Sequence, residues 1–177
     1  MSARGWRSLG HALVLVLLLA LAWWLTQEHD SNGPVDALPA VLQGVPRILD
    51  ADTWELDGHR LRIDGLDAPE FAQQCGPADA PWPCGREAIT ALRTHLRQRP
   101  VHCDVHGRDR YRRVLATCHA GEESLSRWLV RNGWAVAYGR SGDGEDYTRE
   151  ELQAQRERAG IWRDDFTRPQ AWRRQSR

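Results

Sequence analysis

The sequence predicts a mixed α+β fold, a β-barrel with helices in which five short strands form the barrel and about three helices pack around it. Two observations favour this fold class, and a third adds a segment outside it. Short segments of alternating apolar and polar residues are separated by turn residues, as in hairpin-linked strands. Longer segments carry apolar residues at helical spacing. A continuous apolar run near the N-terminus adds a membrane segment, so the 177 residues suit one domain with appendages.

Residues 1–26 have the composition of a membrane-targeting segment. Arg4 and Arg7 precede fourteen consecutive apolar residues, and a polar stretch follows. The main expectation is an uncleaved anchor, because Leu9–Thr26 supplies 18 residues for a spanning helix; the alternative is a signal peptide cleaved near Ala20–Ala22. In both cases the preceding arginines stay in the cytoplasm. We therefore expect an exported domain at the cell envelope, anchored in the inner membrane and facing the periplasm or extracellular side, or else secreted after cleavage.

The rest of the chain divides into a linker, a domain and a tail. Residues 27–39 are polar, contain Gly33 and Pro34 and lack periodicity, which predicts a linker. Residues 40–165 contain all the expected strands and helices and form the predicted domain. Residues 166–177 are expected to be an irregular tail with solvated arginines.

Strands are expected at the start of this domain. The segments VLQGVPRILD, TWEL and RLRIDGL alternate, and Asp57-Gly58 between the last two predicts a two-residue hairpin turn. Further elements are expected after a loop rich in proline and cysteine: a helix from about Gly85 to Arg97, a hairpin from Val101 to His119, a helix from about Glu123 to Arg131, a short strand at WAVAY and a helix from about Thr148 to Ala159. An OB-like barrel fits this order, and such barrels commonly bind nucleic acid, although fold alone does not establish that function.

The four cysteines are expected to form two disulfides, because an exported domain folds in an oxidising compartment. A hairpin that pairs Val105 with Ala116 also pairs Cys103 with Cys118, which leaves Cys75 to pair with Cys84. Zinc is the rival interpretation, since a histidine lies beside Cys103 and another beside Cys118. Adjacent strand residues point to opposite faces, so each pair does not readily converge on one ion, and no zinc is expected.

Acidic residues gather in one short stretch of an otherwise neutral chain. The 24 basic residues, all arginine, balance 24 acidic ones, so any electrostatic attraction is local. Asp50 and Asp52 face the same way from an extended segment, and Asp67 and Glu70 lie on the turn DAPE. Carboxylates that converge need a cation, and oxygen-only ligands suit calcium or magnesium.

Arginines near such a cation indicate a phosphodiester substrate. Arg62 lies on a strand five residues before Asp67, and Arg113 ends the DRYRR loop. A metal ion and two guanidinium groups together can bind a phosphate and stabilise the charge of an in-line displacement. A carboxylate not committed to the metal can take a proton from water. A salt-bridged surface is the plainer interpretation of the same spacing.

Five segments also resemble the thermonuclease, or staphylococcal nuclease-like, family, and in particular its exported bacterial members with four cysteines. They are ILDADTWEL, RLRIDGLDAPE, GRDRYRRVLA, LVRNGWAVAY and AGIW, in order from about Val41 to Trp162. The resemblance implies a five-stranded OB-fold barrel with three helices and calcium-dependent hydrolysis of DNA and RNA.

The resemblance also implies roles for individual residues. Asp52, Asp67 and the backbone carbonyl of Ala68 would bind Ca²⁺, with Asp50 in the outer shell of the ion; Glu70 would be the general base; Arg62 and Arg113 would contact the scissile phosphate; and Arg110, Tyr111 and Tyr138 would lie near the nucleotide.

Two positions depart from the family pattern, because Ala51 and Arg112 stand where glycines are usual. If either position requires a positive φ, the side chain adds strain of about 1 kcal/mol or more. All charged positions remain, so we expect an active, calcium-dependent endonuclease or exonuclease acting as a monomer on DNA or RNA. The alternatives are a catalytically weak OB-fold module that binds nucleic acid or protein at the envelope, and a structural envelope protein.

Overall fold

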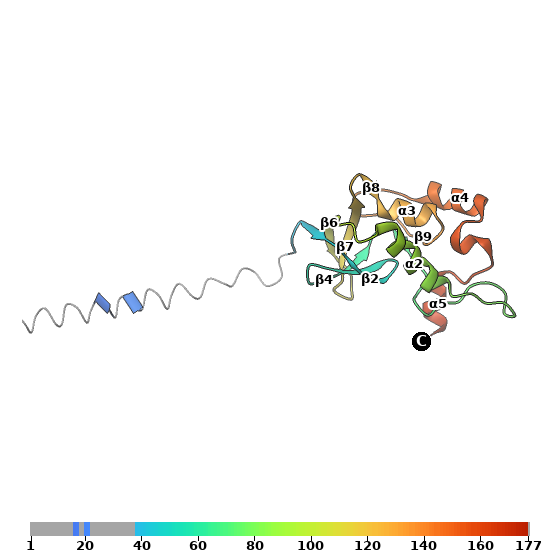
Figure 1. Cartoon of the computed structure of the whole chain (residues 1–177), viewed down its shortest axis with the longest axis horizontal. Coiled ribbons are helices and arrows are strands. Elements are labelled where there is room, and N and C mark those ends of the chain that lie inside the picture. The colour runs from blue at the N-terminus through green and yellow to red at the C-terminus, as the bar shows by residue number, and fades with distance from the viewer. Residues whose placement is uncertain (1–15, 18–19, 22–37, 177) are drawn as a thin grey trace, which may run out of the picture. The chain divides into compact units, whose positions relative to one another are not determined.

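The structure is a computed structural model that describes residues 16–17, 20–21 and 38–176. Residues 38–177 form one compact unit. Its elements in chain order are β1 (Val41–Gly44), β2 (Arg47–Asp50), β3 (Thr53–Leu56), β4 (His59–Ile63), β5 (Leu66–Asp67), α2 (Cys84–Leu96), β6 (Val101–Arg108), β7 (Val114–Ala120), β8 (Glu123–Ser124), α3 (Leu125–Arg131), β9 (Val136–Ala137), α4 (Thr148–Glu157), a 3-10 turn η1 (Gly160–Arg163) and α5 (Pro169–Gln175) (Figure 1). The mixed α+β class predicted from the sequence is confirmed.

The main sheet is open but strongly curled. Its strands follow the order β1-β6-β7-β4-β3-β2, with β8 added beside β7, so β1 and β2 are the two ends of the path. Only Val45 and Pro46 separate these two strands along the chain. Since successive Cα atoms are about 3.8 Å apart, the two ends of the sheet lie within roughly 11 Å of each other at this connection. The sheet therefore approaches a barrel, but the closed five-stranded ladder expected from the sequence is not formed.

The hairpin between β3 and β4 has the predicted turn. Asp57 and Gly58 both have positive φ, 49° and 72°, as a two-residue hairpin turn of the primed type requires. The register pairs Thr53 with Arg62 and Trp54 with Leu61. As a result, the acidic end of β3 lies directly beside the arginine on β4.

The hairpin between β6 and β7 also has the predicted register. Val105 pairs with Ala116 and Cys103 with Cys118, and the latter two form a disulfide. The second disulfide joins Cys75 to Cys84, so both predicted pairings are present. β7 also runs parallel to β4, with Leu61 opposite Val114. This pairing brings the start of β7 to the same end of the sheet as Arg62.

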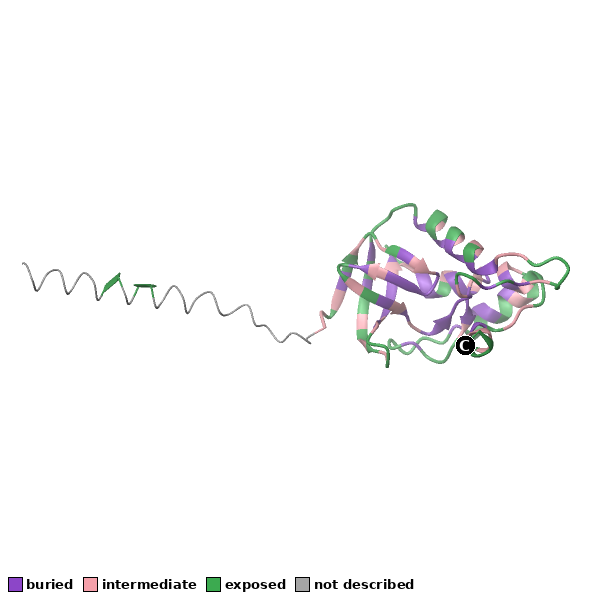
Figure 2. Ribbon diagram, turned by 90° about the horizontal axis from the view of Figure 1, so that it is seen from below, coloured by how far each residue is buried: buried purple, intermediate pink, exposed green. Residues whose placement is uncertain are grey.

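The hydrophobic core fills the space between the curled sheet and the helices (Figure 2). Trp54, Leu61 and Ile63 point into it from the β3–β4 hairpin, while Leu92 and Leu129 come from α2 and α3; all five are fully buried. Burial of a large apolar side chain contributes about 1.5–3 kcal/mol, so these positions fix the sheet and with it the strand ends that carry the charged residues.

The helices match the predicted ones in position but differ at their ends. α2 begins at Cys84 and ends at Leu96, where Arg97 adopts a left-handed conformation. α3 begins two residues later than expected, because Ser124 belongs to β8 and its hydroxyl accepts a hydrogen bond from the Arg127 amide. α4 ends at Glu157, before the left-handed Arg158.

The C-terminal segment contradicts the expectation of an irregular tail. Pro169–Gln175 form α5, with Pro169 in the first turn, where its fixed φ favours helix and its missing N–H costs nothing. Alanine, glutamine and arginine, which follow, are good helix formers. At seven residues the helix is too short to be stable by itself, so contacts elsewhere in the fold must hold it.

The N-terminal membrane segment predicted at residues 1–26 lies largely outside the described residues. Within the part of the chain that the structure describes, no helix is both long and apolar enough to span a bilayer.

Candidate active site

Arg62 joins two buried carboxylates at the end of the sheet. Its Nη1 lies 2.7 Å from Oδ2 of Asp52, and its Nη2 lies 2.8 Å from Oδ1 of Asp67. The Arg62 side chain is 15% exposed, and those of Asp52 and Asp67 are 6% and 1% exposed. Burial alone would lower the pKa of Arg62, but the two carboxylates outweigh burial and raise it. Arg62 is therefore a fixed positive charge.

Backbone pairing places these three residues together. Thr53, next to Asp52, pairs with Arg62 in the β3–β4 ladder, while Asp67 pairs with Val136 between β5 and β9. Asp52 also accepts hydrogen bonds from the Thr53 hydroxyl at 2.9 Å and from the Ala68 amide at 3.0 Å. Asp52 thus connects β3 to the segment that contains Asp67, and neither carboxylate depends on a flexible loop for its position.

Asp50 fastens the loop that begins at Glu70. Its Oδ1 accepts a hydrogen bond of 3.0 Å from the amide of Phe71. Burial, followed by the negative charges of Glu70 and Asp52, raises the pKa of Asp50. These four acidic residues, Asp50, Asp52, Asp67 and Glu70, are called the carboxylate cluster below.

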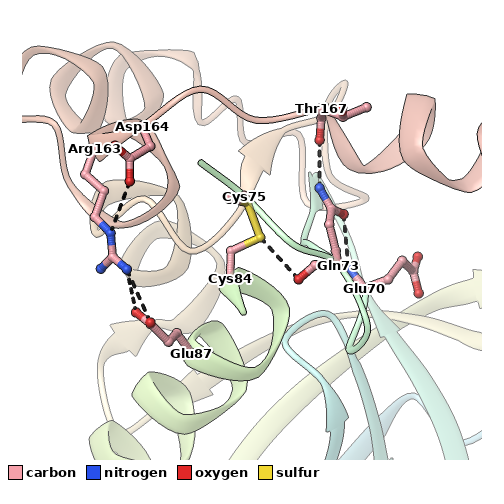
Figure 3. Close-up of a disulfide and its surroundings, with 8 residues drawn as sticks. All are labelled: Glu70, Gln73, Cys75, Cys84, Glu87, Arg163, Asp164 and Thr167. Carbon is pink, nitrogen blue, oxygen red and sulfur yellow. Dashed lines mark hydrogen bonds and ion pairs between the residues drawn. A yellow bond between two sulfur atoms is a disulfide. The ribbon is translucent and has the colours of Figure 1, made fainter. Parts of the chain in front are cut away.

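The backbone of Glu70 is held by Gln73. The Gln73 amide donates to the Glu70 carbonyl at 2.8 Å, and Gln73, which is fully buried, donates its side-chain amide to the Thr167 carbonyl at 2.7 Å. Figure 3 shows Gln73 between Glu70 and Thr167, beside the Cys75–Cys84 disulfide. Gln73 was not identified from the sequence, because its partner Thr167 lies 94 residues away.

Arg113 is oriented by Asp109 within its own loop. Its Nε and Nη2 contact Oδ2 of Asp109 at 2.8 and 2.7 Å, and its Nη1 lies 3.4 Å from the Thr53 hydroxyl. Burial would raise the pKa of Asp109, but hydrogen bonds from Arg113 and from backbone amides lower it. Asp109 was also missed by the sequence reasoning, although its spacing of four residues from Arg113 is a usable signal.

Two exposed tyrosines flank the site. Tyr111 is 55% exposed, with the guanidinium carbons of Arg110 and Arg113 at 4.8 and 5.6 Å from its ring centroid. Tyr138 is 52% exposed, and its hydroxyl accepts a hydrogen bond of 3.3 Å from Gln170. Exposed aromatic rings beside arginines suit contact with nucleic-acid bases and backbone.

A second arginine reaches the carboxylate cluster from α5. Arg173 contacts both Asp67 oxygens, with Nη1–Oδ1 and Nη2–Oδ2 distances of 2.9 Å, and its Nη1 also lies 2.8 Å from Oε1 of Glu70. Burial would lower the pKa of Arg173, but hydrogen bonds to Asp67 and Glu70 outweigh it and raise the pKa above its ordinary value. No periodicity in the tail indicated this contact.

An open groove of about 980 Å³ brings most of the predicted residues together. Its lining includes Asp50, Asp52, Arg62, Glu70, Arg110, Tyr111, Arg113 and Tyr138, with Gln170, Arg173 and Arg174 added from α5. Asp67 and Ala68 are buried next to Arg62 and do not line the groove. The site is therefore a charged, open surface and not an apolar pocket.

The two replaced glycines have different structural consequences. Ala51 is fully buried and is not among the described residues with positive φ, so its methyl group fits the core without backbone strain. Arg112 has a φ of 65°, a left-handed conformation that costs a non-glycine residue roughly 1–2 kcal/mol. Of the two replaced glycines, Arg112 is thus the one that strains the backbone, and it lies in the loop that carries Arg113.

The donor chemistry of the cluster suits a hard divalent cation, because its side-chain ligands are all carboxylate oxygens. The site already attracts positive charge, as the two guanidinium groups on Asp67 demonstrate. Within the described residues, however, no three acidic, histidine or cysteine side chains form a ready metal cluster. Arg62 and Arg173 occupy oxygens that a metal would need.

Comparison with known proteins agrees with this arrangement. Residues 60–164 match the family described as Staphylococcal nuclease homologue. Similar proteins include a succinoglycan biosynthesis protein of Rhizobium meliloti, 37% identical over 142 residues that cover 78% of this chain and 71% of the relative. A thermonuclease of Staphylococcus intermedius is 29% identical over 134 residues, or 70% of this chain and 78% of the relative. An uncharacterised endonuclease of Haemophilus influenzae is 28% identical over 119 residues, or 67% of this chain and 62% of the relative. The chain therefore belongs to the staphylococcal nuclease family.

Proposed function

We propose that the protein is a calcium-dependent nuclease that hydrolyses phosphodiester bonds of DNA or RNA. The observation that carries this proposal is one open groove that is lined by Asp50, Asp52 and Glu70 and by the guanidinium groups of Arg62 and Arg113. Membership of the staphylococcal nuclease family supports a nuclease function in general.

Asp52, Asp67 and the backbone carbonyl of Ala68 would hold the calcium ion, with Asp50 in its outer shell. When bound, such an ion supplies charge neutralisation for the phosphate and orients water. Arg62 and Arg113 bind the non-bridging oxygens of the scissile phosphate, since planar guanidinium groups pair well with phosphate. Glu70 accepts the proton of the attacking water. Arg110, Tyr111 and Tyr138 contact the neighbouring nucleotide.

We place this activity outside the cytoplasm, in a monomer with an OB-type barrel. The two disulfides support an oxidising compartment. Residues 1–26 would target or anchor the chain to the membrane, residues 27–39 would link it, and residues 40–165 would carry the activity.

The test is cleavage of single-stranded DNA, duplex DNA and RNA by the protein with both disulfides formed, in calcium and in chelator. We expect calcium-dependent cleavage by the wild type, and a loss of at least 100-fold in the Glu70→Gln variant with nucleic-acid binding retained. Folded protein that cuts none of the three substrates in calcium would overturn the enzyme assignment.

A catalytically weak module that binds nucleic acid is the second candidate. Its supporting observation is that guanidinium groups already neutralise Asp67 on both oxygens. In that case the same experiment gives retained binding without cleavage in wild type, and Glu70→Gln changes neither.

A further inference from the structure

α5 places a positive charge at the position where the proposed function requires a cation. The guanidinium of Arg173 contacts both oxygens of Asp67 and one oxygen of Glu70, all within 2.9 Å. The helix lies outside the residues that match the family, 60–164. Arg173 therefore lies outside the residues that carry the family match.

The contact leaves little of Asp67 for another ligand. Its Oδ1 is shared by Arg62 and Arg173, its Oδ2 is held by Arg173, and its side chain is 1% exposed. A divalent cation that binds Asp67 must take at least one of these oxygens from a guanidinium group. Arg62 lies in the β4 strand and is 15% exposed, whereas Arg173 is 32% exposed on the seven-residue helix α5. Arg173 is thus the guanidinium group that a divalent cation can displace from Asp67.

The helix that carries Arg173 is weakly attached to the rest of the fold. Only Pro169 is buried among its seven residues. Apart from the Arg173 contacts, its described link to the groove is the 3.3 Å hydrogen bond from Gln170 to the Tyr138 hydroxyl. Short helices with few buried residues open locally at low free-energy cost. Ion pairs with the carboxylate cluster therefore supply much of what holds α5 in place.

We propose that α5 is an intramolecular plug of the cation site, in which Arg173 neutralises Asp67 and Glu70 until a divalent cation displaces it. This inference rests on the proposed function, because it assigns regulation to the same carboxylates. Calcium binding and release of α5 are then one coupled equilibrium. Only molecules in which α5 is released can bind calcium. The apparent calcium affinity is therefore the intrinsic affinity multiplied by the fraction of molecules in which the plug is open.

Calcium binding measured by calorimetry on the disulfide-bonded protein tests the plug without reference to cleavage. Calcium chloride is titrated into the wild type, Arg173→Gln and the control Arg174→Gln, which removes the same charge from the next residue of the helix. We expect the calcium dissociation constant of Arg173→Gln to fall about 10-fold below that of Arg174→Gln, and the control to stay within about twofold of wild type. Arg173→Met, which keeps much of the side-chain length without the charge, should repeat the gain if Arg173→Gln folds poorly.

The results separate the plug from the nuclease assignment. Equal calcium affinity in Arg173→Gln and Arg174→Gln overturns the plug, and so does an absence of calcium binding in every variant. If Arg173→Gln binds calcium more tightly while no variant cleaves nucleic acid, the plug stands and the nuclease assignment fails. If the wild type cleaves in calcium and Arg173→Gln shows no gain in affinity, the nuclease assignment stands and the plug fails.

Discussion

Gly85, in the first turn of α2, lies directly against the backbone carbonyl of Glu70. A Cβ atom at position 85 would sit 1.8 Å from that oxygen, which is far inside van der Waals contact. The obstacle is backbone and cannot rotate away. We expect Gly85→Ala to displace the Glu70 loop, to destabilise the fold by roughly 1–3 kcal/mol and to reduce cleavage by about 100-fold. Urea unfolding and cleavage kinetics measure the two effects.

Arg86→Ala is the matched control for this change, because Arg86 is exposed on the same turn of α2. We expect its stability to stay within about 0.5 kcal/mol of wild type. Full activity in Gly85→Ala would show that the position of the Glu70 backbone does not matter for catalysis.

The charged carboxylate of Asp50 should lower the stability of the calcium-free protein. Its pKa is raised by burial and by Glu70 and Asp52, so the fold favours the neutral carboxyl group. The stabilising effect of protonation is complete below the unfolded pKa of 3.8 and is lost as the pH rises through the higher folded pKa. Asp50→Asn keeps an oxygen to accept the Phe71 amide but carries no charge. We expect it to raise the melting temperature at pH 7 in chelator, with a smaller difference near pH 4.

The same variant should bind calcium more weakly, because one negative charge of the cluster is gone. Asp104→Asn, at an exposed position on β6, is the control and should leave calcium affinity unchanged. A lower melting temperature for Asp50→Asn at pH 7 in chelator contradicts the argument.

Local spacing was enough to predict the parts of the fold that local chemistry determines. Asp57-Gly58 specified its hairpin turn, and strand alternation specified the register that joins Cys103 to Cys118. The open sheet was not predicted, because alternation identifies strands but not whether the two end strands form a ladder. Arg173 was missed for a related reason: its partner Asp67 is 106 residues away, and ion pairs leave no periodic signal in sequence.

Asp109 should be important for cleavage, because it orients the Arg113 side chain. Its carboxylate accepts hydrogen bonds from Nε of Arg113 and from the amides of Tyr111 and Arg113. Asp109→Asn retains an oxygen for the amides but loses the charged contact, so the loop persists while Arg113 loses its orientation. We expect a loss of about 10–100-fold in cleavage with little change in fold, measured as kcat and KM on a short DNA.

The lowered pKa of Asp109 gives this variant a pH signature. Its stabilising contribution is present above the unfolded pKa of 3.8 and disappears as the pH falls through the lower folded pKa. The stability difference between wild type and Asp109→Asn should therefore be constant from pH 7 to pH 5 and shrink below pH 4. Asp79→Asn, in an exposed loop, should show no such change. A difference that grows toward low pH would contradict the assigned ion pair.

The two disulfides should differ in their effect on activity. Cys75–Cys84 closes the loop that follows Glu70, beside the buried Gln73, whereas Cys103–Cys118 links two strands that hydrogen bonds already pair. Replacing Cys75 and Cys84 together with serine should destabilise the fold by roughly 3 kcal/mol and free the Glu70 loop. Cleavage should fall about 10-fold even at temperatures where circular dichroism shows a folded protein. The matched double serine variant at Cys103 and Cys118 should lose comparable stability but keep its activity under those conditions, because neither cysteine lines the groove. Equal activity losses in the two variants would mean that the first disulfide supports the fold as a whole and not the position of Glu70.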